Sequence, residues 1–160
     1  MNHAISLNLG LRRACNWALL PLYMASAAEL SGRYGDLATA AALVERADEL
    51  VSITGGRWCD AEITRLQARF GARDNEHAAA LLHASLAKAR KQGARLWELR
   101  TATDLARVLR EQGNHAAACE SLKPVCEWFS EGRDSADCVA ARVLLDELEQ
   151  RHGGGHFIPS

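Results

Sequence analysis

The chain has 160 residues with a formal net charge of −1, and hydrophobic residues make up 48% of it. This length is enough for one domain with a sizeable core, and the composition excludes global disorder. The near-neutral charge excludes a general attraction to nucleic acid or to an anionic membrane surface. Because no stretch of about 20 residues stays apolar, we also expect no membrane-spanning segment.

The predicted elements are all helices, because apolar residues recur at three- and four-residue spacing and no period-2 alternation is present. After a weak turn or helix over residues 3–13, helices are predicted over 16–30, 37–52, 57–70, 76–91, 96–111, 115–129, and from a cap at Asp134 or Ser135 to about Arg151. Asp36, and Asp74 or Asn75, are the other candidate caps. Pro124 predicts a kink or a premature end in its helix, since it lacks an amide N–H.

The N-terminal segment has a second interpretation. Arg12-Arg13 precede an apolar stretch, and Ala25-Ser26-Ala27 resembles a signal-peptidase site, which is the pattern of an export signal. Polar and bulky residues interrupt that stretch, and it also fits the first helix of a repeat. We expect the repeat helix and a cytoplasmic protein. The odd number of five cysteines, without a C-x-x-C pair, agrees with reduced core thiols.

The sequence resembles itself about every 39 residues. Trp58 and Trp97 are 39 residues apart, and each has a leucine eight residues on, Leu66 and Leu105. Three helix-pairing signatures share nearly this period: Ala40/Val44/Ala47, Ala78/Leu82/Ser85 and Ala118/Leu122/Val125. Such a period is typical of a helical solenoid. We expect an N-terminal extension over 1–15, a repeat domain over 16–151 and a disordered tail over 152–160.

The third repeat unit is similar to a tetratricopeptide repeat. Its first helix has large and small residues in the expected order, Gly113 occupies the turn, and the small residues Ala106 and Ala118 lie where the two helices cross. The first unit fits the same pattern, and the second fits if its turn is one residue shorter. The resemblance implies an all-α, tetratricopeptide-like solenoid of about three helical hairpins plus a C-terminal capping helix.

A more specific resemblance covers about residues 20–149. Three blocks, residues 56–66, 87–107 and 122–137, resemble in order the C-terminal tetratricopeptide-like region of large bacterial signalling proteins. Those proteins join an adenylate cyclase domain or a DNA-binding output domain to a predicted ATPase. The chain departs from that pattern after Leu66, at Cys126 and at Arg133, so it resembles a stand-alone or truncated relative.

The residue patterns of the parent activities are missing from this sequence. There is no G-x-x-x-x-G-K-[ST] phosphate-binding loop, and no pair of metal-binding aspartates in a sheet context. His115 and Cys119 are four residues apart on one predicted helix, but a zinc site needs three or four ligands. A cysteine paired with His77 or His83 lacks any local catalytic signature. Trp58, Trp97 and Trp128-Phe129 are expected to pack rather than to stack on bases. We therefore expect no catalysis, no cofactor and no metal.

The candidate partner-binding residues are on the predicted helix 96–111. Arg100, Thr103, Arg107 and Arg110 share one helix face, where the guanidiniums could hold the carboxylates of an acidic peptide. The alternative is a solvated face that Asp104 or Glu111 partly neutralises. We expect a non-enzymatic module for protein–protein interaction or regulation in bacterial signalling, with a homodimer through the first or last helix as one arrangement. The alternatives are a small-molecule or nucleotide sensor, or a nonfunctional remnant of a larger gene.

Overall fold

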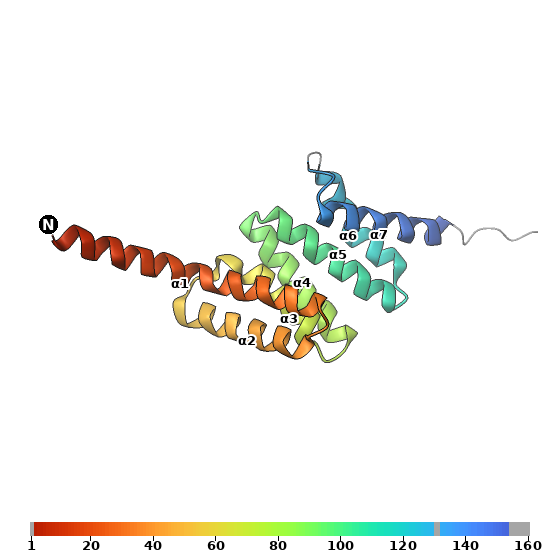
Figure 1. The fold of residues 1–160 in the computed structure, drawn as a ribbon. Coiled ribbons are helices and arrows are strands. Elements are labelled where there is room, and N and C mark those ends of the chain that lie inside the picture. Colours follow the sequence, from red (N-terminus) through yellow and green to blue (C-terminus); the bar gives the residue numbers. More distant parts are fainter. Residues whose placement is uncertain (1, 130–131, 154–160) are drawn as a thin grey trace, which may run out of the picture. The chain divides into compact units, whose positions relative to one another are not determined.

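The computed structural model describes the backbone of residues 2–129 and 132–153, and the side chains of residues 17–129 and 132–150. Seven α-helices and one short 3-10 helix make up the described part, which contains no strand, so the all-α prediction is confirmed (Figure 1). Among the described residues, every helix is too short or too polar to cross a bilayer. The chain divides into two compact units, Met1–Gly71 and Ala72–Ser160.

The first unit contains three α-helices and a short 3-10 helix. They are α1 (Asn2–Arg33), α2 (Leu37–Thr54), η1 (Arg57–Cys59) and α3 (Asp60–Gly71). α2 packs against both α1 and α3, and α1 also contacts α3. Small residues allow this close packing: Ala25, Ala28, Ala40 and Ala47 are at most 2% exposed.

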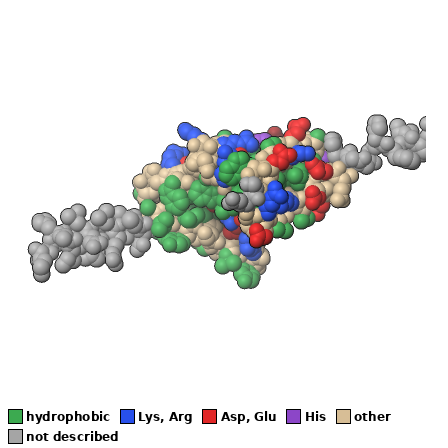
Figure 2. Space-filling model, turned by 90° about the horizontal axis from the view of Figure 1, so that it is seen from above, with side chains coloured by type: hydrophobic (Ala, Val, Ile, Leu, Met, Phe, Trp, Pro, Cys, Tyr) green, Lys and Arg blue, Asp and Glu red, His purple; other side chains and the backbone are tan. Residues whose placement is uncertain are grey.

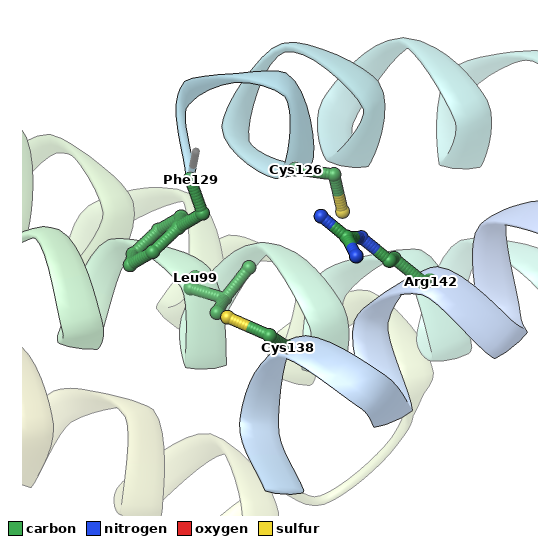
Figure 3. Close-up of a pocket in the computed structure, with 5 residues that line it drawn as sticks. All are labelled: Leu99, Cys126, Phe129, Cys138 and Arg142. Carbon is green, nitrogen blue, oxygen red and sulfur yellow. The ribbon is translucent and has the colours of Figure 1, made fainter. Parts of the chain in front are cut away.

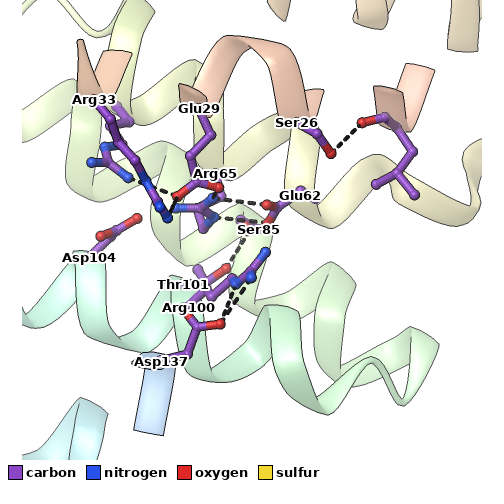
Figure 4. A network of polar contacts seen from close by, with 12 residues as sticks. Ser26, Glu29, Arg33, Glu62, Arg65, Ser85, Arg100, Thr101, Asp104 and Asp137 are labelled. Carbon is purple, nitrogen blue, oxygen red and sulfur yellow. Dashed lines mark hydrogen bonds and ion pairs between the residues drawn. The ribbon is translucent and has the colours of Figure 1, made fainter. Parts of the chain in front are cut away.

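A buried ion cluster joins α1 to α3 in the first unit. The Arg65 side chain is only 2% exposed and donates from Nε and Nη2 to the carboxylate of Glu62, at 2.9 and 2.8 Å. Arg65 also reaches Glu29 of α1 at 3.1 Å, and Glu29 accepts a further bond from Arg69 at 3.3 Å (Figure 4). Because each buried charge has an opposite partner, the cost of removing it from water is offset.

The N-terminal helix is longer than predicted. Instead of a weak segment over 3–13 and a helix over 16–30, α1 is continuous from Asn2 to Arg33 and crosses the expected domain boundary at residue 15. Gly32, which follows the predicted helix end at residue 30, lies in the last turn of α1, where a β-carbon would come 2.4 Å from the Phe70 ring. The absence of a side chain lets α1 and α3 approach there, which outweighs the low helix propensity of glycine. The helix ends instead before Gly35, which has a φ of +84°.

The second unit contains α4 (Asn75–Gln92), α5 (Arg95–Glu111), α6 (His115–Trp128) and α7 (Ala136–Gly153). α5 is central, because it packs against α4, α6 and α7. Leu99, Leu105 and Leu122 are at most 1% exposed in this core. The hydroxyls of Ser85 and Thr101, both fully buried, are hydrogen-bonded at 2.9 Å and link α4 to α5.

The ends of α6 and α7 correct two predictions. α6 continues past Pro124 to Trp128, so the predicted premature end is wrong. Pro124 and Glu120, whose carbonyl loses its helical partner, are both on the exposed side, where water can bind that carbonyl. Ser135 is the cap of α7, since its hydroxyl accepts a bond from the Cys138 amide at 3.4 Å. α7 ends at Gly153, two residues later than expected, so residues 152 and 153 of the tail predicted over 152–160 are helical. The rest of that predicted tail, 154–160, lies outside the described residues.

Turn geometry recurs along the described part of the chain. Gly55 and Gly93 end α2 and α4 in the left-handed conformation, with φ of +69° and +65°. The residues that follow them, Gly56 and Ala94, share nearly the same φ and ψ, −79°/71° and −84°/74°. Asp36, Asp74 and Asn114 each accept a hydrogen bond from the amide three residues on. The connectors after α2 and α4 therefore share the same local geometry, and one lies in each unit.

Candidate interaction surfaces

The predicted arginine row already has acidic partners inside the second unit. Arg100 donates to Asp137 of α7 at 2.9 Å (Figure 4), and Arg110 donates to Glu147 of α7, also at 2.9 Å. Arg107 pairs with Asp104 on its own helix at 2.8 Å, as the solvated-face alternative predicted. The structure thus brings the three guanidiniums onto one side of α5 and occupies each with a carboxylate.

Thr103 and Glu111 do not have the surroundings expected for this row. Thr103 is 6% exposed, and its hydroxyl donates to the Leu99 carbonyl one turn back at 2.8 Å. Glu111 accepts a hydrogen bond from the Asn75 side chain at 3.3 Å. Thr103 is therefore a core residue whose hydroxyl is hydrogen-bonded within its own helix. The sequence spacing alone did not distinguish it from a surface residue.

Replacing Arg110 by glutamine is expected to change the free energy of unfolding by less than about 1 kcal/mol, because its ion pair with Glu147 is partly exposed. Urea unfolding of R110Q, E147Q and the double variant would measure both the single effects and their coupling. A loss above about 2 kcal/mol in R110Q would show that this pair stabilises the packing of α5 against α7 much more than a surface pair does.

A stripe of exposed apolar and aromatic side chains runs along α1. It consists of Leu19, Tyr23, Leu30 and Tyr34, the last directly after the helix, with exposed fractions of 39%, 62%, 55% and 85%. Their spacings of four, seven and four residues place them on one face. We call this surface the α1 stripe. Figure 2 shows hydrophobic side chains gathered on the surface beside the grey N-terminal segment.

The opposite face of α1 is the one that faces the core. Pro21, Ala25 and Ala28 are buried there. Between Trp17 and Leu30 the only charged residue of α1 is Glu29, which is paired with α3. The sequence analysis missed the α1 stripe, although the four-and-seven spacing of its members was a usable signal. Ala25-Ser26-Ala27, considered as a cleavage site, lies inside this helix.

A second candidate site is a small cavity in the second unit, at the end of α4, the start of α5 and the end of α6. Its volume is about 190 Å³, and it is lined by Arg90, Arg95, Glu98, Pro124, Val125, Trp128 and Phe129. Trp128 is 54% exposed, so it is a surface residue, and it packs against Arg95 and Phe129. We call this cavity the Arg90–Arg95 pocket. A neighbouring crevice, lined by Leu99, Cys126, Phe129, Cys138 and Arg142, has no room for a water molecule (Figure 3).

The described thiols have the surroundings of packing residues. Burial, with a smaller contribution from the Asp60 carboxylate, raises the pKa of the Cys59 thiol to about 11. Burial also raises the pKa of Cys119 and of Cys126. Because the thiolate is the reactive form, these shifts lower the nucleophilicity of all three at neutral pH.

His115 and Cys119 are not joined by further metal-ligating side chains among the described residues. Within the residues searched, no group of three or more His, Cys, Asp or Glu side chains could hold a metal ion. The Nδ1 atom of His115 is buried without a hydrogen-bond partner among the described residues. The other ring nitrogen is the one remaining polar atom of that side chain. A zinc site needs three or four ligands, so His115 alone, or His115 with Cys119, is not sufficient.

No protein-family model and no curated protein sequence matches this chain. The features described above are therefore the basis for assigning a function.

Proposed function

We propose that this chain is a non-enzymatic helical module that binds another protein, and that the α1 stripe is its docking surface. The observation that carries this proposal is the exposure of two tyrosines and two leucines on one face of a helix whose other face is buried. Contiguous apolar surface of this kind is typical of protein interaction sites. Aromatic residues supply much of the binding energy in such interfaces.

A second copy of this chain is the occupant that the charges favour. None of the four stripe residues is charged, and the exposed Arg33 beside Tyr34 pairs with Glu29 of the same helix, so two copies related by a two-fold axis would meet with little like-charge repulsion. A self-complementary patch of this kind gives a closed dimer rather than an open polymer. Packing of α1 against its copy would also remove the exposed tyrosine rings from water while their hydroxyls stay at the rim.

The available area predicts a dimer of moderate affinity. Tyr23 and Tyr34 together offer on the order of 300 Å² at their exposed fractions. With the two leucines this reaches about half of the 800 Å² that one partner buries in a standard interface. Leu37, which is 59% exposed at the start of α2, adds apolar surface in the same unit. We therefore expect dissociation constants in the micromolar range.

Sedimentation of the Tyr23→Glu/Leu30→Glu double variant tests this proposal. Wild type is expected to sediment as a dimer at about 100 μM, and the double variant as a monomer with unchanged helical circular dichroism. Val143→Glu is the matched control, because Val143 is an equally exposed helix residue of the second unit, at 53%. A monomeric wild type, or a double variant that stays dimeric, would contradict the docking role of the α1 stripe.

The finer assignments belong to the same proposal. The repeated connectors and the resemblance to bacterial signalling proteins support a tetratricopeptide-like module that acts on a signalling partner in the cytoplasm. Docking of an acidic peptide on Arg100, Arg107 and Arg110 is disfavoured, because each of these arginines already has its own carboxylate, and a further carboxylate would be in excess of the positive charge.

A further inference from the structure

We propose that the Arg90–Arg95 pocket binds a carboxylate attached to a single apolar side chain. This inference goes beyond the proposed function and does not rest on it, since the pocket and the α1 stripe belong to different units. Its basis is the combination of an arginine pair in excess of its counter-ion with an apolar wall in one small cavity.

The polar side of the pocket has a net positive charge. Glu98 accepts a hydrogen bond from Nε of Arg90 at 2.9 Å and from Nη1 of Arg95 at 2.8 Å. The Glu98 side chain is only 6% exposed, while the two arginine side chains are 54% and 45% exposed. Two guanidiniums thus share one buried carboxylate. Since each guanidinium has five N–H donors, several remain on both arginines for a ligand, and a second carboxylate would balance the charge.

The arginines are held in place before any ligand arrives. Glu98 fixes both from the buried side, and the Arg95 guanidinium lies over the Trp128 ring, 4.5 Å from its centroid. Trp128 is itself oriented by an edge contact with Phe129, with ring centroids 5.3 Å apart. Stacking on an indole adds cation–π attraction and limits the rotamers of the arginine. The entropic cost of organising the site on binding is therefore reduced.

The other side of the pocket is apolar and partly exposed. Pro124, Val125, Trp128 and Phe129 line it, and more than half of the Trp128 surface is in contact with solvent. Covering this wall with an aliphatic or aromatic group would release apolar surface from water. A small inorganic anion could bind the arginines but would leave this wall exposed. The pocket therefore favours an organic carboxylate.

The size of the pocket limits the ligand to about one residue. A volume of about 190 Å³ is below the roughly 300–1,000 Å³ of cavities that enclose larger small molecules. One aliphatic or aromatic side chain with its adjoining carboxylate matches this space. The same chemistry is present in a free or capped apolar amino acid and in the C-terminal residue of a protein, so the experiment must separate these two sources.

A ¹H–¹⁵N NMR titration of the full chain tests this site. The probes are N-acetyl-leucine, its carboxamide, and a tripeptide with a C-terminal leucine, and the reporters are the Nε–H signals of Arg90 and Arg95 and the indole signal of Trp128. The acid is expected to shift them saturably, and the carboxamide is expected to bind at least about tenfold more weakly, because it loses the charged hydrogen bonds. Tighter binding of the tripeptide would identify a protein C-terminus as the ligand, and equal binding a single amino acid.

Three variants of the pocket, one control variant and an inorganic anion make the test decisive. R90Q and R95Q should each lower the affinity for N-acetyl-leucine by about tenfold or more. R46Q removes an exposed ion pair with Glu49 in α2 and should leave that affinity unchanged. W128A keeps both arginines but removes part of the apolar wall, so it should also lower the affinity for N-acetyl-leucine. This variant replaces R95Q in the test if R95Q does not fold. No saturable shift, equal binding of the carboxamide, or equal shifts from inorganic phosphate would overturn the proposal.

Discussion

Replacing Arg65 by alanine is expected to lower the free energy of unfolding by about 3–5 kcal/mol. Its side chain is almost completely buried, and its loss would leave Glu62, at 4% exposure, without its bidentate partner. Glu29 on α1 would lose a partner in the same step. An uncompensated buried carboxylate is strongly unfavourable, so the loss exceeds that of a surface ion pair several-fold. Urea unfolding at pH 7 measures the effect.

The matched control replaces both charges. Arg65→Met combined with Glu62→Leu removes the pair and leaves apolar side chains of similar volume, and it should restore much of the stability that R65A loses. If R65A costs less than about 1 kcal/mol, the cluster is hydrated, and its ion pairs contribute little to the packing of α1 against α3.

Replacing Leu105 by alanine is expected to destabilise the chain by about 2–5 kcal/mol. Leu105 has no exposed surface and lies on α5, the helix that packs against all the others in the second unit. The substitution removes apolar contacts and leaves a cavity that surrounding helices fill only in part. Thermal or urea unfolding followed by circular dichroism gives the change directly.

Leu96 provides the control on the same helix. It is 46% exposed, so Leu96→Ala should change the free energy of unfolding by less than about 1 kcal/mol. Equal losses for the two variants would mean that burial of the side chain in the core does not determine the effect. Alanine is the better helix former, so a loss at Leu96 would have to come from packing that the structure does not show.

The sequence was sufficient for elements whose signals are local. α2 and α4 were predicted to within two residues at each end, because Asp36 and Asp74 cap them and glycines follow them. The end of α1 was not predicted as closely, because its continuation through Gly32 depends on the Phe70 ring, which is 38 residues away in the chain. Propensity treats such a glycine as a break, whereas the folded chain uses it as a point of close approach.

The candidate sites show the same division between local and distant information. Helical spacing correctly placed Arg100 and Arg110 on one side of α5, but their partners Asp137 and Glu147 are 37 residues further along the chain. No property of α5 alone reveals those carboxylates. The Arg90–Arg95 pocket is built from three helices, so only the packed unit brings its arginines to Trp128. The α1 stripe, by contrast, was present in the spacing of one helix.

The packing of each helix mainly on its neighbours in the chain has a consequence for how the protein acquires its structure. α1 with α2, α4 with α5, and α5 with α6 make the largest sets of contacts, and each pair is joined by a connector of a few residues. Closing such short loops costs little entropy, and helical proteins with local contacts fold in microseconds to milliseconds. Because Met1–Gly71 contains its own helices and ion cluster, this half can become ordered during synthesis, before the ribosome has released the remainder.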